Sequence, residues 1–219
     1  APADAGFGVG VAVGSPWIGV GTDPPVNVTV RNCVVGAAGA DFATGLQGFG
    51  IQGLTVEGCT FAENASGISM GPGAGGRALR NTLRGVTEAG ISLQGPANTN
   101  EILGNDVALV TGSAAKTVGL YLLGSWHVDK ITGEVIPEPV TTTVVRENNV
   151  HGGTHGVLLA HATGNELSDN DLAGPGRGLW VVDEYAWPNR FFHNNVVAAF
   201  VGVASGFGPI ELSWSSMGS

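Results

Sequence analysis

The chain has 219 residues, of which 43% are hydrophobic, 12% are charged and 37 are glycine. High hydrophobicity with low charge excludes intrinsic disorder, and the length allows one domain with a substantial core. The formal net charge of −9, with only nine basic residues, excludes nucleic acid and anionic membrane surfaces as expected partners.

The chain begins with residues 1–26, which carry no repeat. This segment predicts an irregular N-terminal coil or cap, with one strand at 9–13 and a turn at Pro24-Pro25. Residues 27–205 carry a regular repeat, and residues 206–219 predict a C-terminal cap, because an open stack of strands needs its ends covered. We therefore expect a single domain over residues 1–219.

Two short patterns alternate through the repeat. The first reads apolar, two variable positions, Asn or Cys, one variable position, apolar. The second begins with Gly and then alternates apolar and variable residues, as in Gly67-Ile68-Ser69-Met70. Together they recur about every 22 residues. Alternation with a period of two indicates strands, and units too small to bury their own apolar side must stack on one another.

Stacking aligns equivalent residues of successive units into columns. The Asn side chains are expected to point inward at a bend and to form a ladder, in which each amide bonds the backbone of a neighbouring coil. Cys33 and Cys59 take the Asn position in the first two coils, and the sequence leaves open whether they are free thiols or a disulfide. The expected ladder consists of Cys33, Cys59, Asn81, Asn105, Asn148, Asn170 and Asn194.

This repeat with its ladder resembles the right-handed parallel β-helix family, which comprises the pectate-lyase-like solenoids and includes the periplasmic NosD-like proteins. The resemblance covers about residues 27–205. It implies an all-β fold, a single-stranded right-handed parallel β-helix of about seven to eight coils. We expect an exported protein, whether secreted, periplasmic or on the cell surface. The resemblance is specific for fold and unspecific for function.

The longest departure from the repeat lies near residues 125–139. It adds about fifteen residues and predicts a hairpin arm with its turn at Thr132-Gly133. Inserted segments are where function is expected in a solenoid. Three roles stay open for the arm: covering a hydrophobic face, forming a contact in a homo-oligomer, or forming a wall of a binding groove.

Aromatic and acidic residues gather in one sector of the expected coils. Tyr121 and Trp180 fall in one outward column of the Gly-led strands, with Leu158 between them. Aromatic faces beside acidic groups suit sugar rings, so carbohydrate is the expected partner, although ordinary packing stays open for each aromatic. The expected substrate-binding residues are Tyr121, Trp126, Trp180, Tyr185 and Trp187.

Catalysis is a second possibility for this sector. His161 and Asp183 are expected to be direct neighbours in one column, as an acid–base or orienting pair, with Glu184 beside them. Glycoside hydrolysis needs two carboxylates across the bond. The sequence leaves open whether the protein is an enzyme. If it is, glycoside hydrolysis is favoured over uronate elimination, because the net charge repels polyanions. The alternative is a non-catalytic structural, surface or assembly solenoid.

The histidines do not predict a metal site. His155 and His161 flank one strand, which separates them by about 20 Å, so a shared ion with His151 is not expected. An outward column of Glu147, Asp169 and His193 is the one place where a cation such as calcium is considered. No other cofactor is expected.

Overall fold

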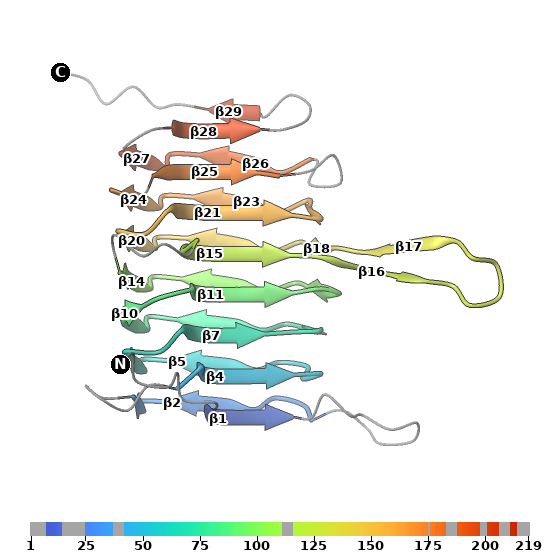
Figure 1. Cartoon of the computed structure of the whole chain (residues 1–219), viewed down its shortest axis with the longest axis horizontal. Coiled ribbons are helices and arrows are strands. Elements are labelled where there is room, and N and C mark those ends of the chain that lie inside the picture. Colours follow the sequence, from blue (N-terminus) through green and yellow to red (C-terminus); the bar gives the residue numbers. More distant parts are fainter. Residues whose placement is uncertain are drawn as a thin grey trace, which may run out of the picture.

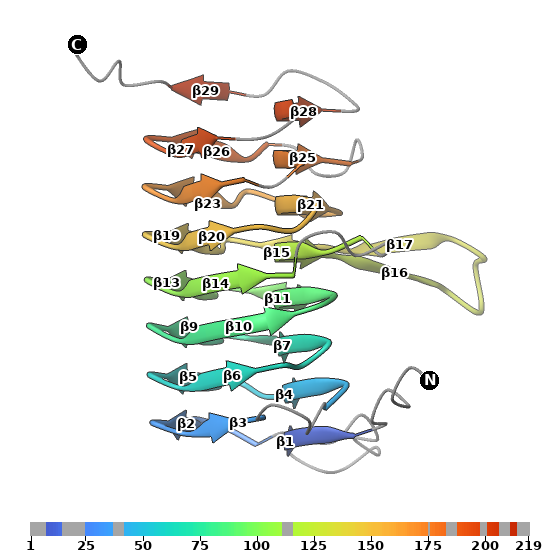
Figure 2. The same ribbon diagram turned by 60° about the vertical axis from the view of Figure 1, so that its left-hand side comes forward.

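The computed structural model describes residues 8–14, 25–36, 42–110, 116–174, 176–182, 188–197, 201–205 and 211–213. This part of the chain is all β and forms a parallel β-helix, in which successive coils stack along one axis (Figures 1 and 2). The predicted fold class is therefore confirmed. No helix in the described ranges is long and apolar enough to cross a membrane.

Each coil contributes strands to three long parallel sheets. The Gly-led sheet contains β1 (Val9–Gly14), β4 (Thr44–Phe49), β7 (Ser66–Met70), β11 (Ala89–Gln94), β15 (Val118–Leu123), β21 (His155–Ala160), β25 (Arg177–Val181) and β28 (Val201–Ser205). The second sheet contains β3 (Val34–Val35), β6 (Thr60–Ala62), β10 (Thr82–Val86), β14 (Asp106–Leu109), β20 (Asn149–His151), β24 (Asp171–Ala173) and β27 (Asn195–Val197).

The third sheet lies on the remaining side of the coil. It contains β2 (Thr29–Arg31), β5 (Thr55–Glu57), β9 (Arg77–Leu79), β13 (Glu101–Leu103), β19 (Val144–Arg146), β23 (Glu166–Ser168), β26 (Arg190–Phe192) and β29 (Glu211–Ser213). A short fourth sheet contains β8 (Gly73–Ala74), β12 (Ala97–Asn98), β18 (Val140–Thr141) and β22 (Ala162–Thr163).

The predicted columns of the Gly-led sheet are confirmed. Ile68, Ile91 and Leu120 are in register and fully buried. The outward residues Ser92 and Tyr121 are also in register with each other. Because successive side chains of a strand alternate across the sheet, one column fills the interior while the next forms the outer surface. The stacked apolar columns make the core.

The Asn ladder is present along the solenoid. The backbone N–H of Asn81 donates to Oδ1 of Asn105 at 2.9 Å, and that of Asn105 donates to Oδ1 of Asn148 at 3.0 Å. The chain of bonds continues through Asn170 to Asn194, each at 3.1 Å. Each buried amide also donates to a backbone carbonyl, so the ladder satisfies groups that would otherwise be unpaired.

The two cysteines extend the ladder at its N-terminal end. Cys59 N–H donates to Oδ1 of Asn81 at 2.9 Å, and Cys33 N–H reaches Sγ of Cys59 at 3.5 Å. Both cysteines are free, so the thiol alternative is the one that the structure contains. Burial raises the pKa of the Cys59 thiol, which keeps it protonated. A thiol can donate and accept weakly, and it therefore replaces the amide in both roles.

A second Asn ladder, which was not predicted, lies at another corner. Gly76 N–H donates to Oδ1 of Asn100 at 2.8 Å, and Thr143 N–H donates to Oδ1 of Asn165 at 2.9 Å. Asn165 N–H in turn donates to Oδ1 of Asn189 at 2.9 Å. These Asn residues each precede a residue of the first ladder by five positions, and that spacing was the signal available in the sequence.

The predicted arm is a hairpin that projects from the coil beyond the sheets (Figure 1). Its strands are β16 (Ser125–Val128) and β17 (Val135–Glu138), which pair antiparallel. Of the expected caps, the N-terminal one is described at 8–14 and 25–26, and the C-terminal one at 211–213. The rest of both segments lies outside the described residues.

Candidate functional site

A groove of about 450 Å³ crosses the outer surface of the Gly-led sheet. We call it the serine groove. Two adjacent outward columns form its floor, and short side chains on β7 and β11 leave the space empty. Tyr121 on β15 is the first bulky residue of its column and closes the groove on that side. The lining residues are Thr44, Gln47, Ser66, Ser69, Glu88, Ala89, Ser92, Gln94, Lys116, Val118, Tyr121 and Leu123.

Hydroxyl and amide groups dominate the floor of the serine groove. Ser69 and Ser92 are in register on neighbouring strands, and Gln94 Nε2 donates to Oγ of Ser69 at 3.2 Å. A serine hydroxyl both donates and accepts, as do the hydroxyl groups of sugars. Ser69, Ser92 and Gln94 carry no charge, so this part of the floor suits a neutral polar ligand.

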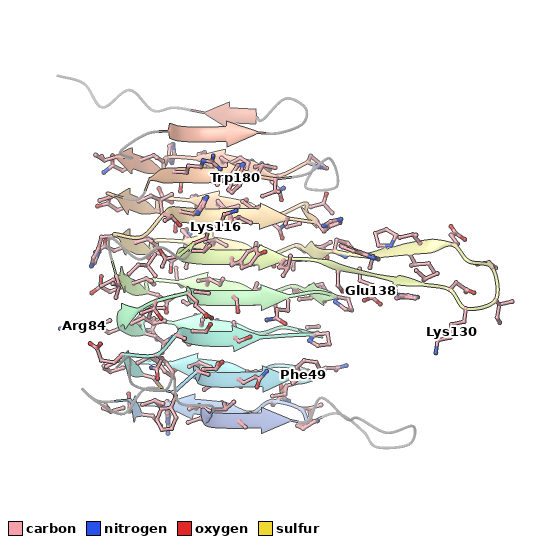
Figure 3. The ribbon with its side chains drawn as sticks, viewed as in Figure 1. Phe49, Arg84, Lys116, Lys130, Glu138 and Trp180 are labelled. Carbon is pink, nitrogen blue, oxygen red and sulfur yellow. The ribbon has the colours of Figure 1, made fainter. Side chains whose placement is uncertain are left out.

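One acidic and one basic side chain line the same groove. Glu88 and Lys116 are both exposed, and Val118 N–H donates to the backbone oxygen of Glu88 at 2.7 Å, which places the two segments side by side. Lys116 lies over the Gly-led sheet in Figure 3. Within the described lining, Glu88 is the one carboxylate. The repeat gives no signal for Glu88 or Lys116, because both lie between the repeated patterns.

The column of Tyr121, Leu158 and Trp180 is aligned as predicted. Leu158 is only 8% exposed and packs with Val118 and Ala160 in a small apolar cluster on the outer surface. Because this cluster fills the space beyond Tyr121, the serine groove extends toward β4 instead of toward Trp180. The structure therefore places Tyr121 in the groove lining and Trp180 outside it.

Trp180 belongs to a stack of three side chains. Its ring lies parallel to that of His155, with centroids 4.8 Å apart, and the Arg177 guanidinium lies 4.1 Å from the centroid of the Trp180 ring. Such contacts stabilise packing by roughly 0.5–2 kcal/mol each. Figure 3 shows Trp180 on the same face of the solenoid as Lys116.

His155 is held in its neutral form within this stack. Burial lowers its pKa below the usual 6.5, and the positive charges of Arg177 and Lys116 lower it further. The Thr154 hydroxyl donates to the backbone oxygen of Thr117 at 2.8 Å and lies 2.9 Å from His155 Nδ1. Because the Thr154 hydroxyl proton is donated to Thr117, the hydroxyl oxygen is the acceptor toward His155. Nδ1 of His155 therefore carries the ring proton and donates it to that oxygen.

Acid is expected to destabilise the protein through His155. The unfolded state takes up a proton below pH 6.5, whereas the folded state resists it, so stability is lost as the pH falls through 6.5 toward the folded pKa. Between pH 7.5 and 5.5, the melting temperature of the wild type is expected to fall further than that of His155→Gln. His151→Gln, which changes a half-buried histidine outside the stack, serves as the control and should follow the wild type. Equal losses in all three proteins would contradict the assignment.

His161 and Trp126 are brought together, away from the serine groove. Their ring centroids lie 5.3 Å apart, with Trp126 on the arm and His161 at the end of β21. Neither lines the groove. The other predicted members of the site, Asp183, Glu184, Tyr185 and Trp187, lie outside the described residues.

A serine, a histidine and a glutamate meet at the root of the arm. Ser125 Oγ lies 2.9 Å from Glu138 Oε2 and 3.0 Å from the backbone oxygen of Gly95, which are the two acceptors for its single proton, and His127 Nδ1 lies 2.8 Å from Glu138 Oε1. A nucleophilic triad requires the histidine to lie between the serine and the acid. Here the carboxylate lies between them, so the cluster fastens the arm to the neighbouring coil.

The described residues contain no group of three or more His, Cys, Asp or Glu side chains that could hold a metal ion. In the column considered for calcium, His193 Nδ1 lies 3.6 Å from Asp169 Oδ1. His151 Nδ1 lies 3.8 Å from Asp106 Oδ1 on the neighbouring coil. These contacts are exposed ion pairs, which stabilise the fold by at most about 1 kcal/mol.

Comparison of the chain with protein-family models and with curated proteins finds no match. The geometry of the surface therefore provides the indication of function. The serine groove combines convergent polar groups with an aromatic ring, as small-molecule sites do.

Proposed function

We propose that the protein binds carbohydrate in the serine groove. One observation carries the proposal, namely a hydroxyl-rich floor closed by the tyrosine ring of Tyr121. An aromatic ring offers an apolar face to the C–H groups of a sugar, while hydroxyl and amide groups bond its edges. The volume of about 450 Å³ lies within the range of known small-molecule sites.

The groove favours an elongated ligand that runs along the solenoid axis. Its floor includes residues from β4, β7, β11 and β15, which are consecutive neighbours in the sheet. At the strand spacing of about 4.8 Å, three steps give a floor of roughly 14 Å. A short oligosaccharide that offers similar groups at regular intervals fits such a repeated floor.

Binding without hydrolysis is the activity that the groove supports best. Hydrolysis of a glycosidic bond requires two carboxylates across it, and the described lining contains Glu88 alone. Hydrolysis through Asp183 and Glu184 stays the alternative for an enzyme. Kinship with the pectate-lyase-like or NosD-like solenoids and export to the cell exterior are part of the same proposal, supported by the Asn ladder and the stacked coils.

The proposal predicts that Tyr121→Ala weakens binding about tenfold, because loss of one stacking ring removes about 1.4 kcal/mol. Ser92→Leu is expected to abolish binding by filling the floor. An array of neutral and acidic oligosaccharides identifies the ligand, and titration calorimetry with the best glycan measures affinity. Trp126→Ala is the matched aromatic control outside the groove and should bind as the wild type does. Absence of binding to every glycan on the array, or unchanged affinity in Tyr121→Ala, would refute the proposal.

Assembly is a second candidate function, and the arm favours it. Trp126, Val128 and Val135 are 59%, 53% and 60% exposed. Apolar side chains grouped on a projecting element are typical of a surface that another molecule covers. An assembly module predicts a change in molecular mass when the arm is altered, with no effect on glycan binding.

A further inference from the structure

The two faces of the arm differ in chemistry. In the antiparallel register, Trp126 lies opposite Pro137 and Val128 lies opposite Val135. Because side chains alternate across a strand, these four residues share one face, and that face is apolar and exposed. The opposite face carries the cluster at the root of the arm described above.

Only one edge of the arm is open to a further strand. Asp129 N–H donates to the oxygen of Glu134 at 2.8 Å, so these residues form a hydrogen-bonded pair. Alternation along an antiparallel pair then directs the N–H and C=O groups of Trp126 and Val128 away from β17. The free edge of β17 is blocked at Pro137, which has no N–H. In the described part of the chain, β16 and β17 pair with each other alone.

We propose that two copies of the protein join through their arms, with β16 of each copy paired antiparallel about a two-fold axis at His127. Trp126 of one copy then lies opposite Val128 of the other, and their free N–H and C=O groups bond across the axis. The product is a four-stranded sheet with one continuous apolar face. The inference does not depend on carbohydrate binding.

The β16 edge is self-complementary in this register. When the two-fold axis passes through His127, the outward-pointing backbone groups of Trp126 meet those of Val128 in the other copy on both sides of the axis. No other position of the axis within β16 pairs as many of these groups. An axis between two residues would set outward groups against inward ones. A foreign peptide would extend the apolar face only if it carried apolar residues at alternate positions, as β16 itself does at Trp126 and Val128.

The opposite face would bring imidazole and carboxylate groups of the two copies together. His127 would face His127 of the other copy at the axis, and each ring lies 2.8 Å from its own Glu138. Asp129, two residues along β16, would lie diagonally from the imidazole of the other copy. Two imidazoles would thus lie among four carboxylates, so the backbone edge and the apolar face, and not the charges, carry the contact.

The contact is small, so a weak and concentration-dependent dimer is expected. The β16 strand has four residues, whereas a standard stable interface buries about 1,600 Å². A dissociation constant of about 10 μM or weaker follows from this size class. Sedimentation equilibrium between about 5 and 500 μM should show a mass that rises from 22.1 kDa toward twice that value.

Val128→Lys tests the proposed edge, because it places a charge on the apolar face beside the two-fold axis. This variant should stay at 22.1 kDa throughout the concentration range. Ile131→Lys is the matched control, since Ile131 is 95% exposed at the turn and lies outside the contact. It should dimerise as the wild type does. A wild-type mass that never exceeds the monomer, or a dimer that survives Val128→Lys, would overturn the proposal.

Cross-linking tests the register. Facing residues of an antiparallel pair that do not share hydrogen bonds have Cβ atoms about 4.5–5.5 Å apart. His127→Cys should therefore give a covalent dimer with copper-phenanthroline, in which two thiols lose two protons and two electrons to the oxidant as one S–S bond forms. Ile131→Cys and the wild type, which carries only Cys33 and Cys59, should stay monomeric under denaturing conditions. Equal cross-linking at positions 127 and 131 would reject the register.

Discussion

Replacement of Asn148 by alanine is expected to lower the free energy of unfolding by about 3 kcal/mol or more. Asn148 is 1% exposed, and its Oδ1 accepts bonds from both the N–H and the side-chain amide of Asn105. Its own amide donates to the backbone oxygen of Ile102 at 2.8 Å. Alanine leaves these buried groups without partners, and each such group costs about 1–3 kcal/mol.

The neighbouring residue supplies the control for this ladder prediction. Asn149 is exposed and makes one side-chain bond, to Asp106 at 3.1 Å, so Asn149→Ala should cost less than about 0.5 kcal/mol. Asn148→Asp keeps an acceptor for Asn105 but loses the donor for Ile102. Urea denaturation should rank the stabilities as wild type, Asn149→Ala, then the two Asn148 variants. Similar stabilities for Asn148→Ala and Asn149→Ala would contradict the role assigned to the ladder.

Contacts between coils could be predicted from the sequence because they depend on register alone. Once the repeat is aligned, residues at equivalent positions must be neighbours, as Tyr121 and Leu158 are. Register likewise predicts the ladder from Asn81 to Asn194, which the structure contains. Strand spacing and side-chain alternation are nearly constant in a parallel sheet, so little else is needed.

Contacts between columns could not be predicted in this way. Trp180 stacks on His155, which lies in a different column and an adjacent coil. Side-chain rotamers decide such diagonal contacts, and a repeat pattern holds no information about them. The predicted column of Tyr121, Leu158 and Trp180 gives no indication of this diagonal partner.

The serine groove depends on changes in side-chain size along the columns. It arises because short side chains follow one another in two columns over β7 and β11, and a larger ring follows on β15. Aromatic residues in these columns predict the sugar-binding sector, but they do not mark the groove. A change in side-chain size along one column, from Ser92 to Tyr121, was the available signal for a groove.

The same stacking explains why glycine leads one strand of each coil. A Cβ atom built on Gly90 would lie 2.5 Å from the backbone oxygen of Gly119, and one built on Gly119 would lie 2.6 Å from that of Gly156. Each glycine thus allows the carbonyl of the next coil to approach. Since the neighbour is backbone and cannot rotate away, the repeat requires glycine here for space.

Gly119→Ala is therefore expected to destabilise the protein by about 3 kcal/mol. The new methyl group would also lie 2.2 Å from Cγ1 of Val150, in the core, so coils must separate or Val150 must leave its rotamer. Gly133→Ala is the control, because a Cβ there meets nothing within 4 Å and only its positive φ of 73° adds a cost of about 1–2 kcal/mol. Urea denaturation of both variants separates steric clash from backbone strain. If Gly119→Ala costs no more than Gly133→Ala, close approach of the coils is not what selects glycine in the repeat.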